Sequence, residues 1–126
     1  MPLSRREIRT RAVKFAKQWA AASEEEADAK PFWYEFFHVF GIRARTVGSY
    51  EVHVRKLDNA LGKIDYFWPG MVLIEHKSRG KDLKKAAVQA ADYLHGVKEH
   101  EQPRFILVSD FARFVLYDLD SGSETE

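Results

Sequence analysis

The 126-residue sequence contains no cysteine. This absence excludes disulfides, thiol nucleophiles and zinc-thiolate sites, and it fits a reducing compartment, so we expect a cytoplasmic protein. The sequence also has no signal peptide and no apolar run long enough to span a bilayer, so we expect no membrane partner. The five histidines show no zinc-binding spacing, which removes the remaining common zinc sites.

The net charge is only +1, but the charges are unevenly distributed. Basic residues crowd into residues 77–85, whereas residues 118–126 are acidic. The acidic end has no apolar periodicity, so we expect residues 120–126 to be a disordered tail or the start of a linker. A hydrophobic content of 45% over this length predicts one compact domain, which we place at residues 1–119.

Hydrophobic periodicity predicts an α/β (α+β) fold with a mixed central sheet of about five strands flanked by helices. The helical part, residues 4–41, begins with Ser4 and Glu7 in a capping-box pattern, and Ser23 and Glu26 form another before a second helix that Gly41 ends. The expected helices are residues 4–22, 24–40 and 81–97, and the expected strands, within a core of residues 48–119, are 48–56, 63–68, 71–78, 104–109 and 113–119. Strand 71–78 is apolar on both faces and is therefore expected at the centre, joined through the helix to a parallel strand 104–109.

Charges interrupt the apolar pattern of the two strands on either side of Pro69-Gly70. Asp65 lies on the first strand, and Glu75 and Lys77 lie on the second. Two carboxylates can hold Mg²⁺ while a lysine faces the attacking water or the scissile phosphate. A surface ion pair is the simpler alternative, but three charges in strands this apolar indicate a catalytic site, because buried charges without partners are costly.

The loop between these strands decides whether the three charges can meet. With a strict two-residue loop, Asp65 would oppose Ile74 and Glu75 would point to the other face of the sheet. Convergence of Asp65, Glu75 and Lys77 therefore requires a loop with an odd number of residues, or a bulge in one strand.

Three further groups are candidates for the same site. The backbone carbonyl of His76 could be an additional metal ligand. Gln89 and Tyr93 are four residues apart and share one helix face, where they could support the site or contact DNA, although Tyr93 in the core and Gln89 in solvent is the simpler interpretation. Glu35 is a weaker candidate for a third acid near the metal.

The basic cluster surrounds the expected start of a helix, whose free N–H groups favour phosphate. We therefore expect the basic cluster to bind double-stranded DNA through the backbone phosphates of the DNA. A solvated lysine-rich helix face looks the same in sequence. The cluster comprises Lys77, Arg79, Lys81, Lys84 and Lys85.

Asp65, Glu75-His-Lys77 and Gln89-x-x-x-Tyr93 together resemble the PD-(D/E)XK nuclease superfamily, with Ile64 standing at the proline position of its name. The chain further resembles the N-terminal endonuclease domain of type IIL restriction-modification enzymes in Ala29-Lys-Pro-Phe32, Phe36-Phe-His-Val-Phe-Gly-Ile42, Phe67-Trp-Pro-Gly70, Ile74-Glu-His-Lys-Ser-Arg-Gly-Lys-Asp-Leu83, Gln89-Ala-Ala-Asp-Tyr93 and Pro103-Arg-Phe-Ile-Leu-Val-Ser-Asp-Phe111.

This resemblance implies a Mg²⁺-dependent deoxyribonuclease, for which Mn²⁺ can substitute. It also implies a bacterial parent protein that continues into a helical connector, an adenine-specific DNA methyltransferase domain using S-adenosylmethionine, and a target-recognition domain. No methyltransferase motif lies in this sequence, so we expect either an excised domain of such a longer protein or a standalone relative. Two alternatives stay open: a catalytically silent DNA-binding or assembly domain of a methyltransferase, and a protein-interaction module that uses the aromatic second helix.

Overall fold

The computed structural model describes residues 3–23, 25–56 and 58–126, without the side chains of Glu25 and Glu26. Within these residues, no helix combines the length and apolar character that a membrane crossing requires. In chain order the elements are α1 (Arg5–Gln18), α2 (Glu25–Val39), α3 (Ala44–Val47), β1 (Ser49–Arg55), β2 (Leu61–Trp68), β3 (Val72–His76), α4 (Leu83–Tyr93), the 3₁₀ turns η1 (Leu94–Gly96) and η2 (Glu99–Glu101), β4 (Phe105–Ser109), β5 (Phe114–Asp118) and β6 (Ser123–Thr125).

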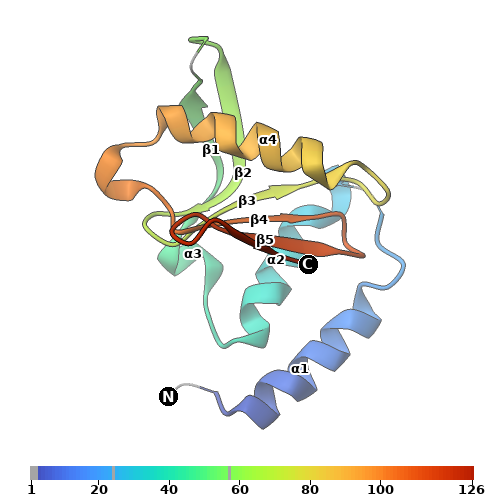
Figure 1. Cartoon of the computed structure of the whole chain (residues 1–126). Coiled ribbons are helices and arrows are strands. Elements are labelled where there is room, and N and C mark those ends of the chain that lie inside the picture. Colours follow the sequence, from blue (N-terminus) through green and yellow to red (C-terminus); the bar gives the residue numbers. More distant parts are fainter. Residues whose placement is uncertain (1–2, 24, 57) are drawn as a thin grey trace.

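Within the described residues, the strands form one six-stranded sheet in the order β1-β2-β3-β4-β5-β6. Only β3 and β4 are parallel, and α4 connects them, as the strand-helix-strand pattern predicts. Helix α4 covers one face of the sheet, and α2 packs on the other, with α1 outside it (Figure 1). The α/β prediction with a mixed sheet is therefore confirmed, with six strands instead of about five.

Strand β3 lies in the middle of the sheet, and all five of its residues are buried, which confirms its predicted central position. Alternation along this strand divides its side chains between two hydrophobic cores. Leu73 packs with α4, whereas Ile74 packs with the aromatic residues of α2. The residues that follow Leu73 at every second position therefore face the α4 side.

Both ends of the helical part show the local chemistry that the sequence predicts. The Ser4 hydroxyl accepts from the Glu7 N–H (3.1 Å), and the Glu7 carboxylate accepts in return from the Ser4 N–H (3.3 Å), completing the capping box. Gly41 takes the left-handed φ of +74° just after α2 ends. The second predicted capping box depends on the side chain of Glu26, which lies outside the described part of the chain.

Residues 120–126, expected as a disordered tail or linker, contain the short strand β6 paired with β5. The Asp118 carboxylate accepts from the backbone N–H groups of Asp120 (3.0 Å) and Ser121 (3.4 Å), and Gly122 supplies a φ of +74°, so the chain turns back on itself. The β6 side chains are all exposed. A strand without a buried face leaves no periodic apolar signal in the sequence, which is why the pattern did not predict it.

Candidate functional site

The loop between β2 and β3 has three residues, Pro69, Gly70 and Met71, because Trp68 pairs with Val72 and Tyr66 pairs with Ile74. This odd number confirms the condition for convergence, since extending the same register places Asp65 opposite Glu75. Asp65 Oδ2 accepts a 2.8 Å hydrogen bond from the backbone N–H of His76, which fixes the aspartate against β3.

The side chains of β2 also change face close to Asp65. Ile64 and Phe67 both pack in the α4-side core, although they are three residues apart, while Tyr66 packs in the α2-side core. Regular alternation would put Ile64 and Tyr66 on the same face. The strand is therefore irregular around Asp65, as strands next to active sites often are.

The two carboxyl groups lie close together, with Glu75 buried and Asp65 half-buried. Glu75 is only 2% exposed, and its burial together with the nearby charge of Asp65 raises its pKa to about 8. Burial also raises the pKa of Asp65, although the His76 N–H opposes the shift. Two neighbouring carboxylates repel each other when both are ionised, and a bound cation would offset this repulsion.

This donor set fits a hard divalent cation. Glu75 Oε1 is buried without a hydrogen-bond partner among the described residues, and carboxylate oxygens are the ligands that Mg²⁺ prefers. Within the described chain no group of three or more His, Cys, Asp or Glu side chains is placed to hold a metal. Asp65 and Glu75 would therefore supply two ligands, with water, phosphate or backbone oxygens completing the shell, and the His76 carbonyl stays a prediction for one of them.

Lys77 continues the α4-side face of β3 and connects the carboxylates to α4. Its Nζ lies 3.6 Å from Glu75 Oε2 and donates to Gln89 Oε1 at 2.7 Å. Gln89 Nε2 in turn donates to the hydroxyl of the buried Tyr93 at 2.8 Å. The structure thus brings together Glu75, Lys77, Gln89 and Tyr93 in one continuous chain of contacts.

The imidazole of His76 points to the opposite face from Glu75. Its Nδ1 accepts a 2.9 Å hydrogen bond from the indole of Trp33 on α2, and its ring packs 4.2 Å from that of Phe111. Burial lowers the pKa of His76 to about 4, so the ring is neutral at physiological pH. Sequence reasoning missed this contact, because nothing local to the chain indicates which aromatic residue of α2 meets His76.

Glu35 does not join the site. It lies with Arg11 and Lys14 around a cavity between α1 and α2. The helical period explains the placement, because the same turns of α2 direct Trp33 and Phe37 into the core under the sheet. The structure therefore places Glu35 at the α1–α2 contact and not among the residues that line the cavity beside Asp65.

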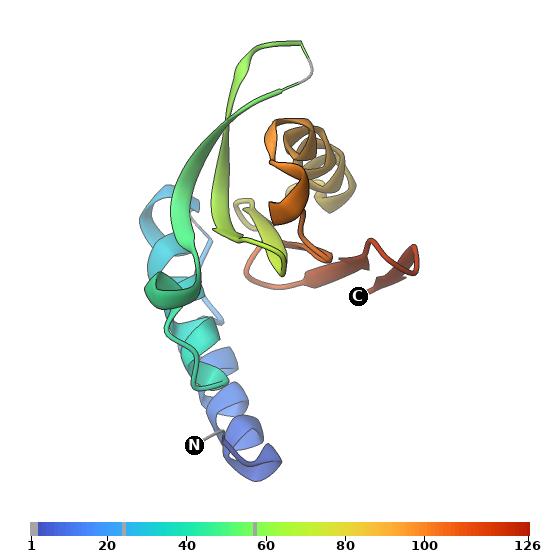
Figure 2. The ribbon, with the colours of Figure 1, turned by 90° about the vertical axis from the view of Figure 1, so that its left-hand side faces the viewer.

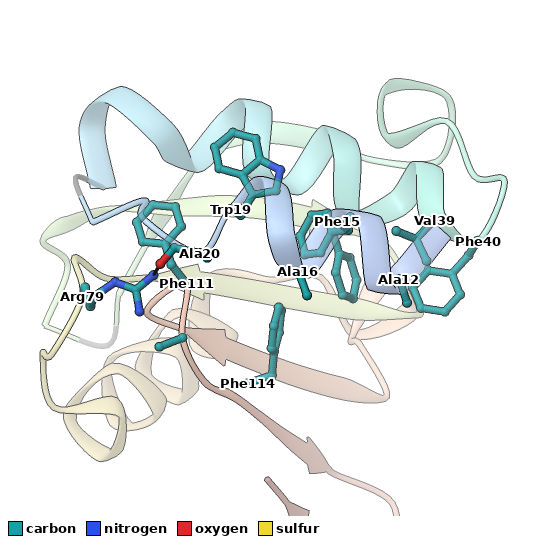
Figure 3. A pocket seen from close by; sticks show the side chains of 12 residues that line it. Ala12, Phe15, Ala16, Trp19, Ala20, Val39, Phe40, Arg79, Phe111 and Phe114 are labelled. Carbon is teal, nitrogen blue, oxygen red and sulfur yellow. Dashed lines mark hydrogen bonds between the residues drawn. The ribbon is translucent and has the colours of Figure 1, made fainter. Parts of the chain in front are cut away.

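Arg79 makes structural contacts that the sequence did not predict, and its contact with phosphate stays a prediction. Its guanidinium donates to the carbonyls of Ala22 (2.8 Å) and Ala20 (3.0 Å), just after the C-terminal end of α1. Figure 3 shows this side chain at one end of an apolar cavity between α1, α2 and the β4–β5 region. The cavity has a volume of about 480 Å³. None of Asp65, Glu75 and Lys77 lines that cavity, so it belongs to the packing of α1 and not to the site.

The start of α4 also differs from the expectation. The carboxylate of Asp82 caps the helix and accepts from the backbone N–H groups of Lys84 (2.9 Å) and Lys85 (3.3 Å). These donors are therefore not free to bind phosphate. Lys81, Lys84 and Lys85 are exposed, and Lys81 and Lys85 line an opening together with Lys77. Phosphate contact through their side chains stays a prediction.

The Arg79 contacts lead to a prediction about stability. Arg79→Ala should lower the free energy of unfolding by about 1 kcal/mol, because two carbonyls lose their hydrogen-bond donor at a partly solvated position. Lys81→Ala should leave it unchanged and weaken DNA binding instead. Denaturant unfolding and DNA titrations of both variants check this, and a fully stable Arg79→Ala protein with weakened DNA binding would contradict it.

One known protein family matches most of this chain. The family described as "MmeI, N-terminal domain" matches residues 10–126. The chain belongs to this family, the N-terminal module of a restriction-modification enzyme. Searches of curated proteins and of solved structures found no match.

Proposed function

We propose that this chain is a Mg²⁺-dependent DNA endonuclease module of the PD-(D/E)XK type, the N-terminal part of a bacterial restriction-modification DNA methyltransferase. The observation that carries the proposal is the placement of Asp65 and Glu75 on adjacent strands. Their carboxyl groups interact, Glu75 is buried, and the Lys77 amine lies 3.6 Å from Glu75. Family membership supports the restriction-modification context. The partners are double-stranded DNA and the methyltransferase and target-recognition domains of the same polypeptide.

Each side chain has a distinct task in this proposal. Asp65 and Glu75 hold the cation, with the His76 carbonyl as a further ligand. When bound, Mg²⁺, or Mn²⁺ in its place, neutralises the carboxylates, polarises a phosphate oxygen and lowers the pKa of a bound water. Lys77 places a positive charge where negative charge develops on the phosphate, and Gln89 and Tyr93 keep that amine in place through their hydrogen bonds.

A second candidate is a catalytically silent DNA-binding or assembly domain. The almost complete burial of Glu75 favours it, because a carboxylate that is 2% exposed must become accessible before it can hold a hydrated cation. The two functions predict different behaviour with metal. A silent domain would bind DNA equally well with Mg²⁺ or with a chelator, whereas the nuclease module gains affinity with Mg²⁺.

Plasmid nicking by the complete polypeptide that the gene encodes tests the proposal. With Mg²⁺ or Mn²⁺ we expect conversion of supercoiled DNA to nicked and linear forms, and with EDTA none. S-adenosylmethionine is included in a parallel reaction, because it would serve only the methyltransferase region. DNA that stays supercoiled under every metal condition would contradict the nuclease assignment.

The contact between Lys77 and Gln89 leads to a prediction about rate. Gln89→Ala should reduce cleavage by roughly 10-fold while changing the free energy of unfolding by less than about 1 kcal/mol, because it frees the Lys77 amine at an exposed position. Gln89→Glu, which can still accept from Lys77, should recover part of the rate. Equal loss in both variants would contradict a positioning role for the amide oxygen.

A further inference from the structure

A second opening borders Asp65, and Lys77 is not among the residues that line it. It is a cavity of about 300 Å³ between α2, β1 and β2, and its polar and aromatic lining comprises Lys30, Trp33, Tyr50, Glu51, Lys63 and Asp65. Figure 2 shows β1 and β2 as a long curved ribbon that passes α2 at its lower end. Asp65 is therefore shared between the carboxylate pair and this pocket.

Glu51, one of the residues that line this pocket, has an unusual backbone conformation. Its φ is +55°, a left-handed value that non-glycine residues rarely adopt. The β1–β2 ladder pairs Tyr50 with Tyr66 and Val52 with Ile64, and it is interrupted between them, where Glu51 lies across from Asp65. Backbone strain of this kind persists only where the surroundings impose it, and it clusters at functional sites.

The carboxylate of Glu51 lies between two lysines. Lys30 Nζ is 3.0 Å from Glu51 Oε2, and Lys63 Nζ is 3.7 Å from Glu51 Oε1. All three side chains are about half exposed, at 55%, 50% and 47% for Lys30, Lys63 and Glu51, so solvent and ligands can reach them. The hydrogen bond and charge of Lys30 hold the pKa of Glu51 below its usual range, so Glu51 is an anion that two ammonium groups bind.

We propose that Lys30 and Lys63 form a subsite for a backbone phosphate of the DNA strand next to the carboxylate pair, and that Glu51 occupies this subsite when DNA is absent. Lys30 and Lys63 line the same cavity as Asp65, which places the subsite beside the proposed site of cleavage. A phosphodiester is a singly charged anion like the carboxylate that it replaces, and lysine binds it as a point charge. The inference rests on the proposed function, because it assigns a neighbouring phosphate to the same DNA strand.

The test is binding of a fluorescein-labelled DNA duplex to the protein in EDTA, measured by anisotropy over a range of salt concentrations. Lys30→Ala and Lys63→Ala should each weaken binding by on the order of 5-fold and reduce the slope of log K against log salt by about one phosphate contact. Glu51→Gln should strengthen binding by a similar factor, because it removes the competing anion. Lys98→Ala, an exposed lysine outside this pocket, is the matched control and should have little effect.

Glu51→Gly is a second variant that removes the carboxylate and also suits a positive φ, so it should bind DNA as tightly as Glu51→Gln and melt at or above the temperature of the parent. Any of three results would contradict the subsite. The unsubstituted protein does not bind the duplex at low salt, both lysine variants bind as tightly as Lys98→Ala, or neither Glu51 variant binds more tightly than the unsubstituted protein. These outcomes are separate from the nuclease proposal, because binding in EDTA does not depend on cleavage.

Discussion

Asp65→Asn, Glu75→Gln and Lys77→Ala are each expected to lower Mg²⁺-dependent DNA cleavage by at least roughly 100-fold. The first two remove a charge that holds the cation, and the third removes the positive charge next to Glu75. Plasmid cleavage by the complete polypeptide measures the rates. Glu35→Gln is the matched control, because this carboxyl group lies against α1 and should leave the rate unchanged.

The three variants should also differ in metal binding. Lys77→Ala should keep most of the affinity for Mn²⁺, because the lysine is not a ligand, whereas Asp65→Asn and Glu75→Gln should lose it. Calorimetric titration with Mn²⁺ separates the two groups. Full cleavage by all three variants would exclude a catalytic role for these residues.

Glu75→Gln is expected to stabilise the metal-free protein, by an amount that grows with pH. The pKa of Glu75 is raised from 4.5 to about 8 in the folded state, so between these values the folded protein binds more protons than the unfolded chain. Stability contributed by the protonated carboxyl is therefore present below about pH 4.5 and is lost as the pH rises through about 8. At roughly 1.4 kcal/mol per pKa unit, the cost reaches on the order of 3 kcal/mol at pH 7, and the neutral amide of glutamine avoids it.

Thermal melts in EDTA at pH 5, 7 and 8.5 check this prediction. The variant should melt close to the parent at pH 5 and several degrees above it at pH 8.5, and Mn²⁺ should raise the melting temperature of the parent only. Glu124→Gln on the exposed strand β6 serves as a control that should follow the parent at every pH. A variant that is less stable than the parent at pH 8.5 would instead indicate that Glu75 and Lys77 form a structural ion pair.

The sequence predicts the central part of this site well, because alternation and turn geometry act over short distances. Glu75 and Lys77 share a face in any register, and the requirement for an odd loop leaves few ways to bring Asp65 to them. The three-residue loop satisfies that requirement. Gln89 and Tyr93 could be assigned to one helix face for the same reason. Only the packing of α4 on the sheet shows that Gln89 accepts from Lys77 and donates to Tyr93.

The remaining features depend on contacts between distant parts of the chain. In the sequence, Arg79 looks like one more cation in a basic cluster. In the structure, its guanidinium donates hydrogen bonds to two backbone carbonyls just after the end of α1. Trp33 is one aromatic residue among many, and only the position of α2 selects it as the partner of His76. Glu51 reads as an ordinary exposed residue of a strand, because a sequence does not reveal a left-handed φ in a non-glycine residue.

The central claim is that Asp65 and Glu75 together hold a divalent cation. Anomalous scattering from crystals of the protein soaked in Mn²⁺ tests it most directly, since Mn²⁺ takes the same oxygen ligands as Mg²⁺ and is identified by its signal. We predict one strong peak within coordination distance of both carboxyl groups, and no peak there in Glu75→Gln crystals. Density for Mn²⁺ at other carboxylates, with none between Asp65 and Glu75 at a pH above 8, would contradict the claim.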